Sequence, residues 1–159
     1  IPMSINIVPA RIVKTHWEAV EEGAGEAGRT PDRSAWRICR DIYVAETTAQ
    51  ARREVLEGVL RRDFEQYFLP LLANRKILGL LKADPDMPDS DLTAEYLMDN
   101  VWIVGSPEDV ADQLRQLYAD VGGFGVLIAM GHEWLPREGW INSMTLLQNE
   151  VMPKLADLN

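Results

Sequence analysis

The sequence predicts an α/β fold built on parallel strands. Extended and helical patterns alternate along its 159 residues, in the order β-α-β-α-irregular-α-β-α. Residues 124–130 form a nearly continuous apolar run, which is typical of a strand buried on both faces of a parallel sheet. Three clear strands are too few for a closed eight-stranded barrel, which needs about 250 residues.

The first half of the chain predicts two strand–helix units. Residues 5–8 are rich in β-forming side chains, and residues 13–27 repeat apolar side chains at helical spacing. Residues 36–45 predict a second strand, and a long helix over 47–69 follows, which Pro70 stops or bends. The two faces of the second strand carry, respectively, Ile38, Ile42 and Val44, and Arg37, Cys39, Asp41 and Tyr43.

The second half begins with a long irregular segment. Residues 70–100 show no sustained periodicity and contain an acidic, turn-rich stretch at 84–91, so they predict an insertion that serves as a mobile lid. A short extended segment at 101–105 precedes a helix, for which Ser106 supplies the N-cap. The apolar run at 124–130 and a final helix over 138–158 complete the chain.

Composition excludes several classes of function. The net charge of −9 disfavours nucleic acid and anionic membrane surfaces as partners. One cysteine excludes a disulfide within the chain, and with only two histidines a metal site is not expected. No apolar run approaches the roughly 20 residues that span a bilayer, and no signal peptide opens the chain, so we expect a cytoplasmic protein.

A set of short motifs occurs in a recognisable order. They are residues 2–6 (PMSIN), 36–47, 105–111 (GSPEDVA), 122–125 (GGFG), 132–134 (HEW), 143–144 (SM) and 150–153 (EVMP). Together they resemble the C-terminal end of the bacterial luciferase-like, flavin-dependent monooxygenases. The resemblance implies a TIM barrel, of which residues 1–159 would form the C-terminal part: about three βα units plus the insertion at 70–100. The opening at Ile1, without an initiator methionine, fits either a processed terminus or a break inside a barrel.

The resemblance also implies an activity and its partners. Family members oxidise small organic substrates with O2 and reduced FMN, which a separate flavin reductase supplies; the deazaflavin F420 serves a related branch and is the less expected cofactor. The fragment alone is expected to be inactive and to need a homo-oligomer or an N-terminal barrel segment to cover its exposed edges. The alternative is a non-catalytic half-barrel that acts as a flavin-binding or scaffold subunit. A hydrolase is disfavoured because the chain has no G-x-S-x-G motif.

The TIM-barrel rule selects candidate residues at the C-terminal ends of the first two strands. Ser4 and Asn6, expected on one strand face, are predicted to contact the flavin; a polar layer satisfied by its neighbours is the alternative. Cys39 is predicted to line the flavin cavity and not to act as a nucleophile. Arg40 and Asp41 interrupt an apolar strand and are expected to form an ion pair.

The loop after the last strand carries the other candidates. His132 is the predicted catalytic residue, because a histidine at a strand end could donate to flavin or substrate oxygen; a bond to nearby backbone is the alternative. Met130, Glu133 and Trp134 are predicted to contact substrate. Glu133 could instead orient His132 or be a solvated acid, and Trp134 could instead pack the loop onto the next helix.

Overall fold

The structure, a computed structural model, describes residues 1–133 and 135–158 and centres on one long strand. This strand, β2 (Arg37–Val44), pairs in parallel with β1 (Met3–Ser4), β3 (Ile103–Gly105) and β4 (Val126–Met130). The N–H of Arg37 donates to the carbonyl of Pro2, beside β1, and the N–H of Ala45 donates to the carbonyl of Gly105 in β3. N–H groups that lie an even number of residues apart in a strand point to the same edge of that strand. The β1 and β3 segments therefore share one edge of β2, and β4 occupies the other edge.

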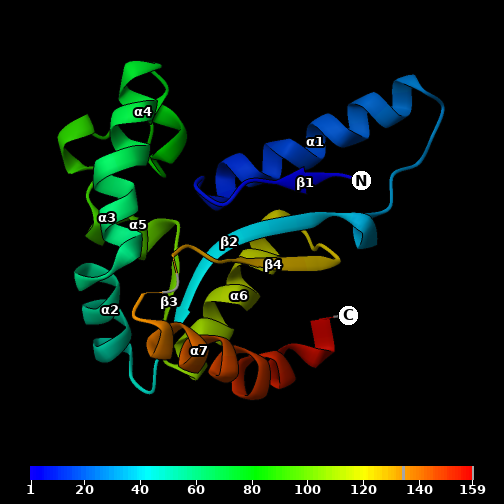
Figure 1. Cartoon of the computed structure of the whole chain (residues 1–159). Helices are drawn as coiled ribbons and strands as arrows, with labels where there is room; N and C mark the ends of the chain where they lie inside the picture. The colour runs from blue at the N-terminus through cyan, green and yellow to red at the C-terminus, as the bar shows by residue number, and fades with distance from the viewer. Residues whose placement is uncertain (134, 159) are drawn as a thin grey trace.

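Helices cover one face of this sheet. They are α1 (Ala10–Glu26), α6 (Pro107–Val121), the π-helix η5 (Leu147–Val151) and the 3-10 helix η6 (Met152–Leu158), with α7 (Arg137–Leu146) before η5. In the view of Figure 1, α1 appears above the strands, and α6 and α7 appear below them. The helices α1 and α6 nevertheless pack on the same face, because Trp17 of α1 and Leu114 of α6 belong to one core. We call the covered side the helix face and the opposite side the inner face.

The helix face holds a tightly packed core. Its buried residues from β2 pack against the indole rings of Trp17 and Trp36, whose centroids are 5.1 Å apart, and against apolar side chains of α6 and η5. They are Ile38, Ile42 and Val44. The predicted alternation of β2 is confirmed, because these residues share one face while Cys39, Asp41 and Tyr43 lie on the other.

A stack of short helices stands at the C-terminal end of β2, at the left of Figure 1. It comprises α2 (Thr48–Glu57), α3 (Val59–Asp63), the π-helix η2 (Phe64–Phe68), α4 (Leu69–Asn74), the 3-10 helices η3 (Leu78–Leu81) and η4 (Asp89–Asp91), and α5 (Ala94–Asn100). A further 3-10 turn, η1 (Arg33–Ala35), precedes β2. Arg11 of α1 holds the stack by donating to the carbonyls of Gly79, Lys82 and Ala83. Lys82 Nζ and Asp89 Oδ1 lie 2.7 Å apart and form an ion pair that holds the turn-rich stretch against η3.

Three expectations for these elements are wrong. The predicted helix over 47–69 breaks at Gly58, where a Cβ atom would lie 2.5 Å from the carbonyl oxygen of Glu54, and the helical path continues past Pro70, which occupies the first turn of α4. The first strand is Met3–Ser4 and not 5–8, because the chain turns at Asn6. The β4 strand is partly exposed and not buried on both faces, since it has a strand neighbour on only one edge among the described residues.

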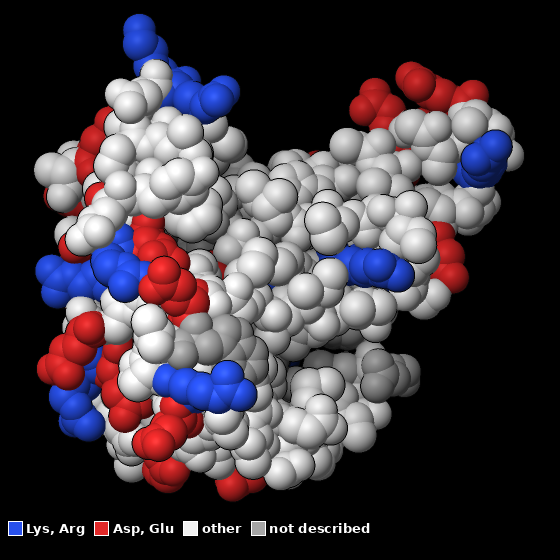
Figure 2. Space-filling view, viewed as in Figure 1, with Lys and Arg blue, Asp and Glu red and all other residues white. Residues whose placement is uncertain are grey.

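The ends of α6 follow their sequence signals. The Ser106 hydroxyl accepts a hydrogen bond from the N–H of Asp109, Pro107 is the first residue of the helix, and Gly122 ends it with a φ of 78°. In the described part of the chain, no helix is both long enough and apolar enough to cross a bilayer. Figure 2 shows a mostly uncharged surface across the middle of the molecule, with acidic and basic side chains gathered over the helix stack.

Candidate functional site

Four side chains from four separate segments meet at the C-terminal end of the sheet. Asn6 Nδ2 donates to Asp41 Oδ2 at 2.8 Å, and the other oxygen of Asp41 lies 2.7 Å from His132 Nε2. The second ring nitrogen of His132, Nδ1, lies 3.0 Å from Asp63 Oδ2 of α3. The site is thus a continuous chain of contacts from the turn after β1 to the helix stack, and we call it the mouth cluster.

Two members of the mouth cluster are shielded from solvent. The side chains of Asp41 and His132 are 2% and 11% exposed. They border a small apolar cavity of about 10 Å³, lined by Ile7, Leu60, Phe64, Phe68, Leu81, Leu97 and Trp102, which is too small for more than one water molecule. In such surroundings a hydrogen bond to a charged group is stronger than in water.

The pKa of the His132 imidazole lies above its ordinary value. The hydrogen bond to Asp41 is the largest cause, burial acts in the opposite direction, and the charge of Asp41 and the bond to Asp63 add to the rise. In place of the bond to nearby backbone that was the alternative for His132, the ring makes two carboxylate contacts. Glu133, the residue that could have oriented His132, instead pairs with Arg62 at 2.6 Å, and its side chain is 58% exposed.

Arg40 lies on the helix face, yet its hydrogen bonds hold the backbone beside the mouth cluster. It is 2% exposed, and its Nη1 donates to the carbonyls of Ile5, Asn6 and Cys39 at 3.2–3.4 Å. Burial lowers the pKa of its guanidinium to about 10. The expected ion pair with Asp41 does not form, because neighbouring residues of a strand point to opposite faces. Arg40 instead holds the turn that presents Asn6 to Asp41.

The two predicted flavin contacts near the N-terminus lie on opposite sides of the sheet. Ser4 pairs in register with Ile38 of the helix face; it is fully buried there, and its hydroxyl accepts a hydrogen bond from the Trp36 indole at 3.0 Å. Asn6 follows the turn and faces Asp41. The expectation that they share a face is therefore wrong, and Ser4 is separated from the mouth cluster.

Other predicted residues do line the inner face. Cys39 and Met130 lie there with Asp41, since Cys39 is paired with Ile128 and Asp41 with Met130. Burial, the largest cause, raises the pKa of the Cys39 thiol, so it is protonated and a poor nucleophile. Trp134 lies outside the described residues. No group of three or more candidate ligands converges on a metal position among the described residues.

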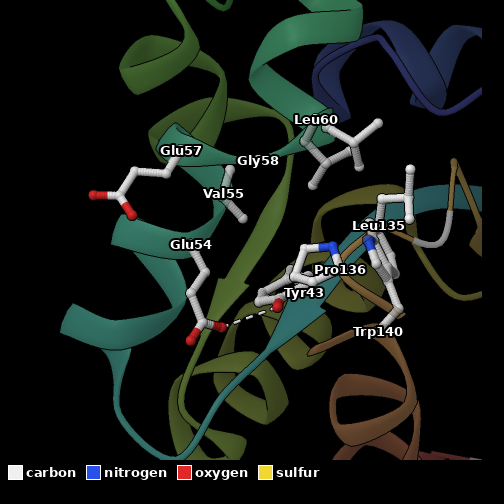
Figure 3. A pocket seen from close by; sticks show the side chains of 10 residues that line it. Tyr43, Glu54, Val55, Glu57, Gly58, Leu60, Leu135, Pro136 and Trp140 are labelled. Carbon is white, nitrogen blue, oxygen red and sulfur yellow. Dashed lines mark hydrogen bonds between the residues drawn. The ribbon is translucent and has the colours of Figure 1, made fainter. Parts of the chain in front are cut away.

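A larger cavity of about 250 Å³ lies beside the mouth cluster, between α2, α3 and the start of α7. Its walls are Tyr43, Glu54, Val55, Glu57, Gly58, Val59, Leu60, Leu135, Pro136 and Trp140. Figure 3 shows the Tyr43 hydroxyl pointing to Glu54, to which it donates at 2.9 Å. Burial and this bond raise the pKa of Tyr43, so its hydroxyl is a neutral donor.

The sequence reasoning missed Asp63. Helix α3 places this residue 69 positions before His132, in a segment whose pattern marks only apolar contacts. The one sequence signal near Asp63 is Gly58. This glycine ends α2 early, so that the next helix, α3, turns toward the mouth cluster.

Comparison with known proteins agrees with this geometry. Residues 2–123 match the family model described as luciferase-like monooxygenase. The chain is 35% identical to 3,6-diketocamphane 1,6-monooxygenase of Pseudomonas putida over 144 residues, which is 90% of this chain and 38% of that protein. It is 31% identical to limonene 1,2-monooxygenase of Rhodococcus erythropolis over 93% of this chain and 36% of that protein. The chain thus spans less than half the length of these relatives.

Solved structures give the same answer. The oxygenating constituent of 3,6-diketocamphane monooxygenase of Pseudomonas putida, a type II Baeyer-Villiger monooxygenase in complex with FMN, matches with a TM-score of 0.85 and 34% identity over 96% of this chain and 42% of that one. An F420-dependent tetrahydromethanopterin reductase of Methanopyrus kandleri shares the fold, with a TM-score of 0.54 and 17% identity. With its family model covering most of the sequence, this chain belongs to the luciferase-like monooxygenases.

Proposed function

We propose that the chain is the C-terminal part of a TIM-barrel monooxygenase that uses reduced FMN and O2 to oxidise a small organic substrate. The observation that carries the proposal is the mouth cluster: its side chains Asn6, Asp41 and His132 lie toward the C-terminal ends of parallel strands, where TIM-barrel enzymes place their active sites. The similarity to the FMN complex of the diketocamphane enzyme favours FMN over F420. A flavin reductase would supply the reduced cofactor, and the enzyme would be cytoplasmic.

The inner face fits a flavin ring. It offers an apolar wall of Cys39, Ile128 and Met130, and it ends in the polar pair Asn6 and Asp41. A flat aromatic ring with one hydrogen-bonding edge matches such a surface. When bound, reduced flavin supplies the electrons that activate O2.

The chain's own residues would bind, orient and exclude water. Asn6, held by Asp41 and by the Arg40 clamp on its carbonyl, would bind the polar edge of the ring. The helix stack, through Phe64 and Leu81, keeps water from Asp41 and His132. Met130 and Glu133 would border the substrate, and His132 is the candidate for a proton-donating role, for which it must exchange one carboxylate for the reacting oxygen.

FMN titration tests the proposal. The 159-residue chain, alone and co-expressed with the part of the diketocamphane relative that it does not cover, would be titrated with FMN and assayed with a flavin reductase. We expect binding and turnover only in the co-expressed form. Asn6→Ala should weaken FMN binding there about tenfold, the worth of one hydrogen bond. Ser4→Ala, on the helix face, is the matched control and should leave the affinity unchanged. Tight binding with turnover by the chain alone would refute the fragment hypothesis.

A non-catalytic half-barrel is the second candidate, and the exposed inner face favours it. Met3 and Val126 are 63% and 39% exposed although both are large and apolar. Such a surface needs a partner, either a second copy or an N-terminal barrel segment. Sedimentation of the purified chain separates the cases: a stable dimer without flavin affinity supports a scaffold subunit, and a stable monomer contradicts both forms of partner.

A further inference from the structure

The contacts of His132 fix the number of protons in the mouth cluster. A neutral imidazole has one N–H and one lone pair, so it can donate to one carboxylate only. Here Nε2 lies 2.7 Å from Asp41 and Nδ1 lies 3.0 Å from Asp63. With a neutral ring, one nitrogen lone pair would face a carboxylate oxygen within hydrogen-bond distance, which is repulsive. The geometry therefore requires one additional proton.

The charged groups around the ring favour placing that proton on His132. Asp41 comes from β2 and Asp63 from α3, and both approach the ring directly. Arg62 of α3 lies 3.3 Å from the other oxygen of Asp63 and also pairs with Glu133 of the histidine's own loop. From α7, the Trp140 ring lies 6.4 Å from the imidazole, centroid to centroid. Two carboxylates against one ring stabilise the imidazolium.

We propose that Asp63 is a positioning residue of this site: from the helix stack it completes, with Asp41, a clamp that holds His132 doubly protonated at the end of β4. The proposal rests on the proposed function for its meaning in catalysis, since the clamp fixes the ring where substrate would bind. It gives α3 a role that its sequence pattern does not reveal, because the clamp joins the helix stack to the loop after β4.

The clamp has a consequence for chemistry at the mouth. Asp41, an imidazolium and Asp63 together carry a net charge of −1, so the cluster would not attract an anionic group. A doubly held imidazolium is also no general base, because neither nitrogen has a lone pair. Release from Asp63, whose side chain is 28% exposed against 2% for Asp41, is the easier way to free a ring nitrogen.

Histidine NMR tests the clamp directly. The chain has only two histidines, His16 and His132, so ¹⁵N signals of the ring nitrogens can be assigned with one His16→Gln variant. In the unmodified chain we expect both nitrogens of His132 to be protonated at pH 7. Asp63→Asn should lower the titration midpoint of His132 by about half a pH unit or more and leave one nitrogen unprotonated at pH 7. Asp41→Asn should lower the midpoint further, because its bond is the larger cause of the raised pKa.

Glu65→Gln is the matched control. Glu65 lies two residues from Asp63, pairs with Arg61 at 2.8 Å, and makes no hydrogen bond or ion pair with the mouth cluster among the described residues, so its loss should leave the His132 midpoint unchanged. An unaltered midpoint in Asp63→Asn, an equal shift in Glu65→Gln, or a singly protonated ring in the unmodified chain at pH 7 would each overturn the proposal. The titration needs no flavin, so failure of the co-expressed form to bind FMN would refute the proposed function and leave the clamp standing.

Discussion

The two faces of β2 differ in what they contribute. On the helix face, Ile38, Ile42 and Val44 are buried among tryptophans and helices. On the inner face, Asp41 joins the mouth cluster, and Tyr43 borders the larger cavity. Because side chains alternate along a strand, one eight-residue segment supplies both the core and the candidate site.

Arg40 shows how the two faces are connected. It occupies the apolar face, but its guanidinium reaches the carbonyls of Ile5 and Asn6 at the sheet edge. At most positions of β2, a substitution should therefore affect either the stability of the helix-face core or the geometry of the inner face. At Arg40, a substitution should affect both. The following predictions test that division.

Trp36→Ala should have the largest effect on stability. It removes a fully buried ring that stacks on Trp17 and donates to Ser4, and the expected loss is about 3–5 kcal/mol of unfolding free energy. Urea unfolding followed by circular dichroism measures this loss. Trp36→Phe keeps an aromatic ring and should cost less. A loss below about 1 kcal/mol for Trp36→Ala would show that the helix face does not dominate stability.

Arg40→Met should cost less, about 2 kcal/mol, because it removes the buried donor that bonds to three carbonyls while filling much of the same volume. Unlike Trp36→Ala, it should also disturb the inner face, visible as a changed Asn6 side-chain amide signal in NMR spectra. A more stable variant would mean that the cost of burying the charge exceeds the worth of its bonds.

The two histidines should contribute to the pH dependence of stability with opposite signs, since burial and Arg40 lower the pKa of His16 while the carboxylate contacts raise the pKa of His132. The folded pKa of His132 lies above its unfolded value near 6.5, so its contribution is fully present below that value and is lost as pH rises through the folded pKa. We expect the unfolding free energy to fall across that rise. This fall should be absent in His132→Gln and should persist in His16→Gln, which removes the opposing contribution of His16. A slope of opposite sign would contradict the imidazolium.

Glu133→Gln should have the smallest effect. Its partner Arg62 and its own side chain are both largely exposed, so solvent screens the pair. We expect no measurable change in the urea midpoint, and a clear loss would extend the structural role of the mouth cluster to its solvent-facing rim.

Local signals account for what the sequence predicted well. The alternation over β2 and the Ser106 cap depend on neighbours within a few residues, and both agree with the structure. The break at Gly58 and the turn at Asn6 were missed because they depend on backbone contacts that no periodicity encodes. The strand-end rule selected Asn6 and His132, which the structure brings together in the mouth cluster, whereas Asp41 was expected to pair with Arg40 and bonds to these two residues instead. Asp63 was missed because it reaches the cluster only through the path of the helix stack.

The shared edge of β2 has a further meaning for redesign. Between the end of β1 and the start of β3, the Arg40 guanidinium bonds to the carbonyls of Ile5 and Asn6 after β1 and of Cys39 in β2 itself, and it takes the place of backbone ladder bonds there. Extending β1 in its present register would pair residue 6 with Arg40 and turn the Asn6 side chain to the helix face. A longer, more regular strand would therefore remove Asn6 from Asp41, so the shortness of β1 is itself a requirement of the site.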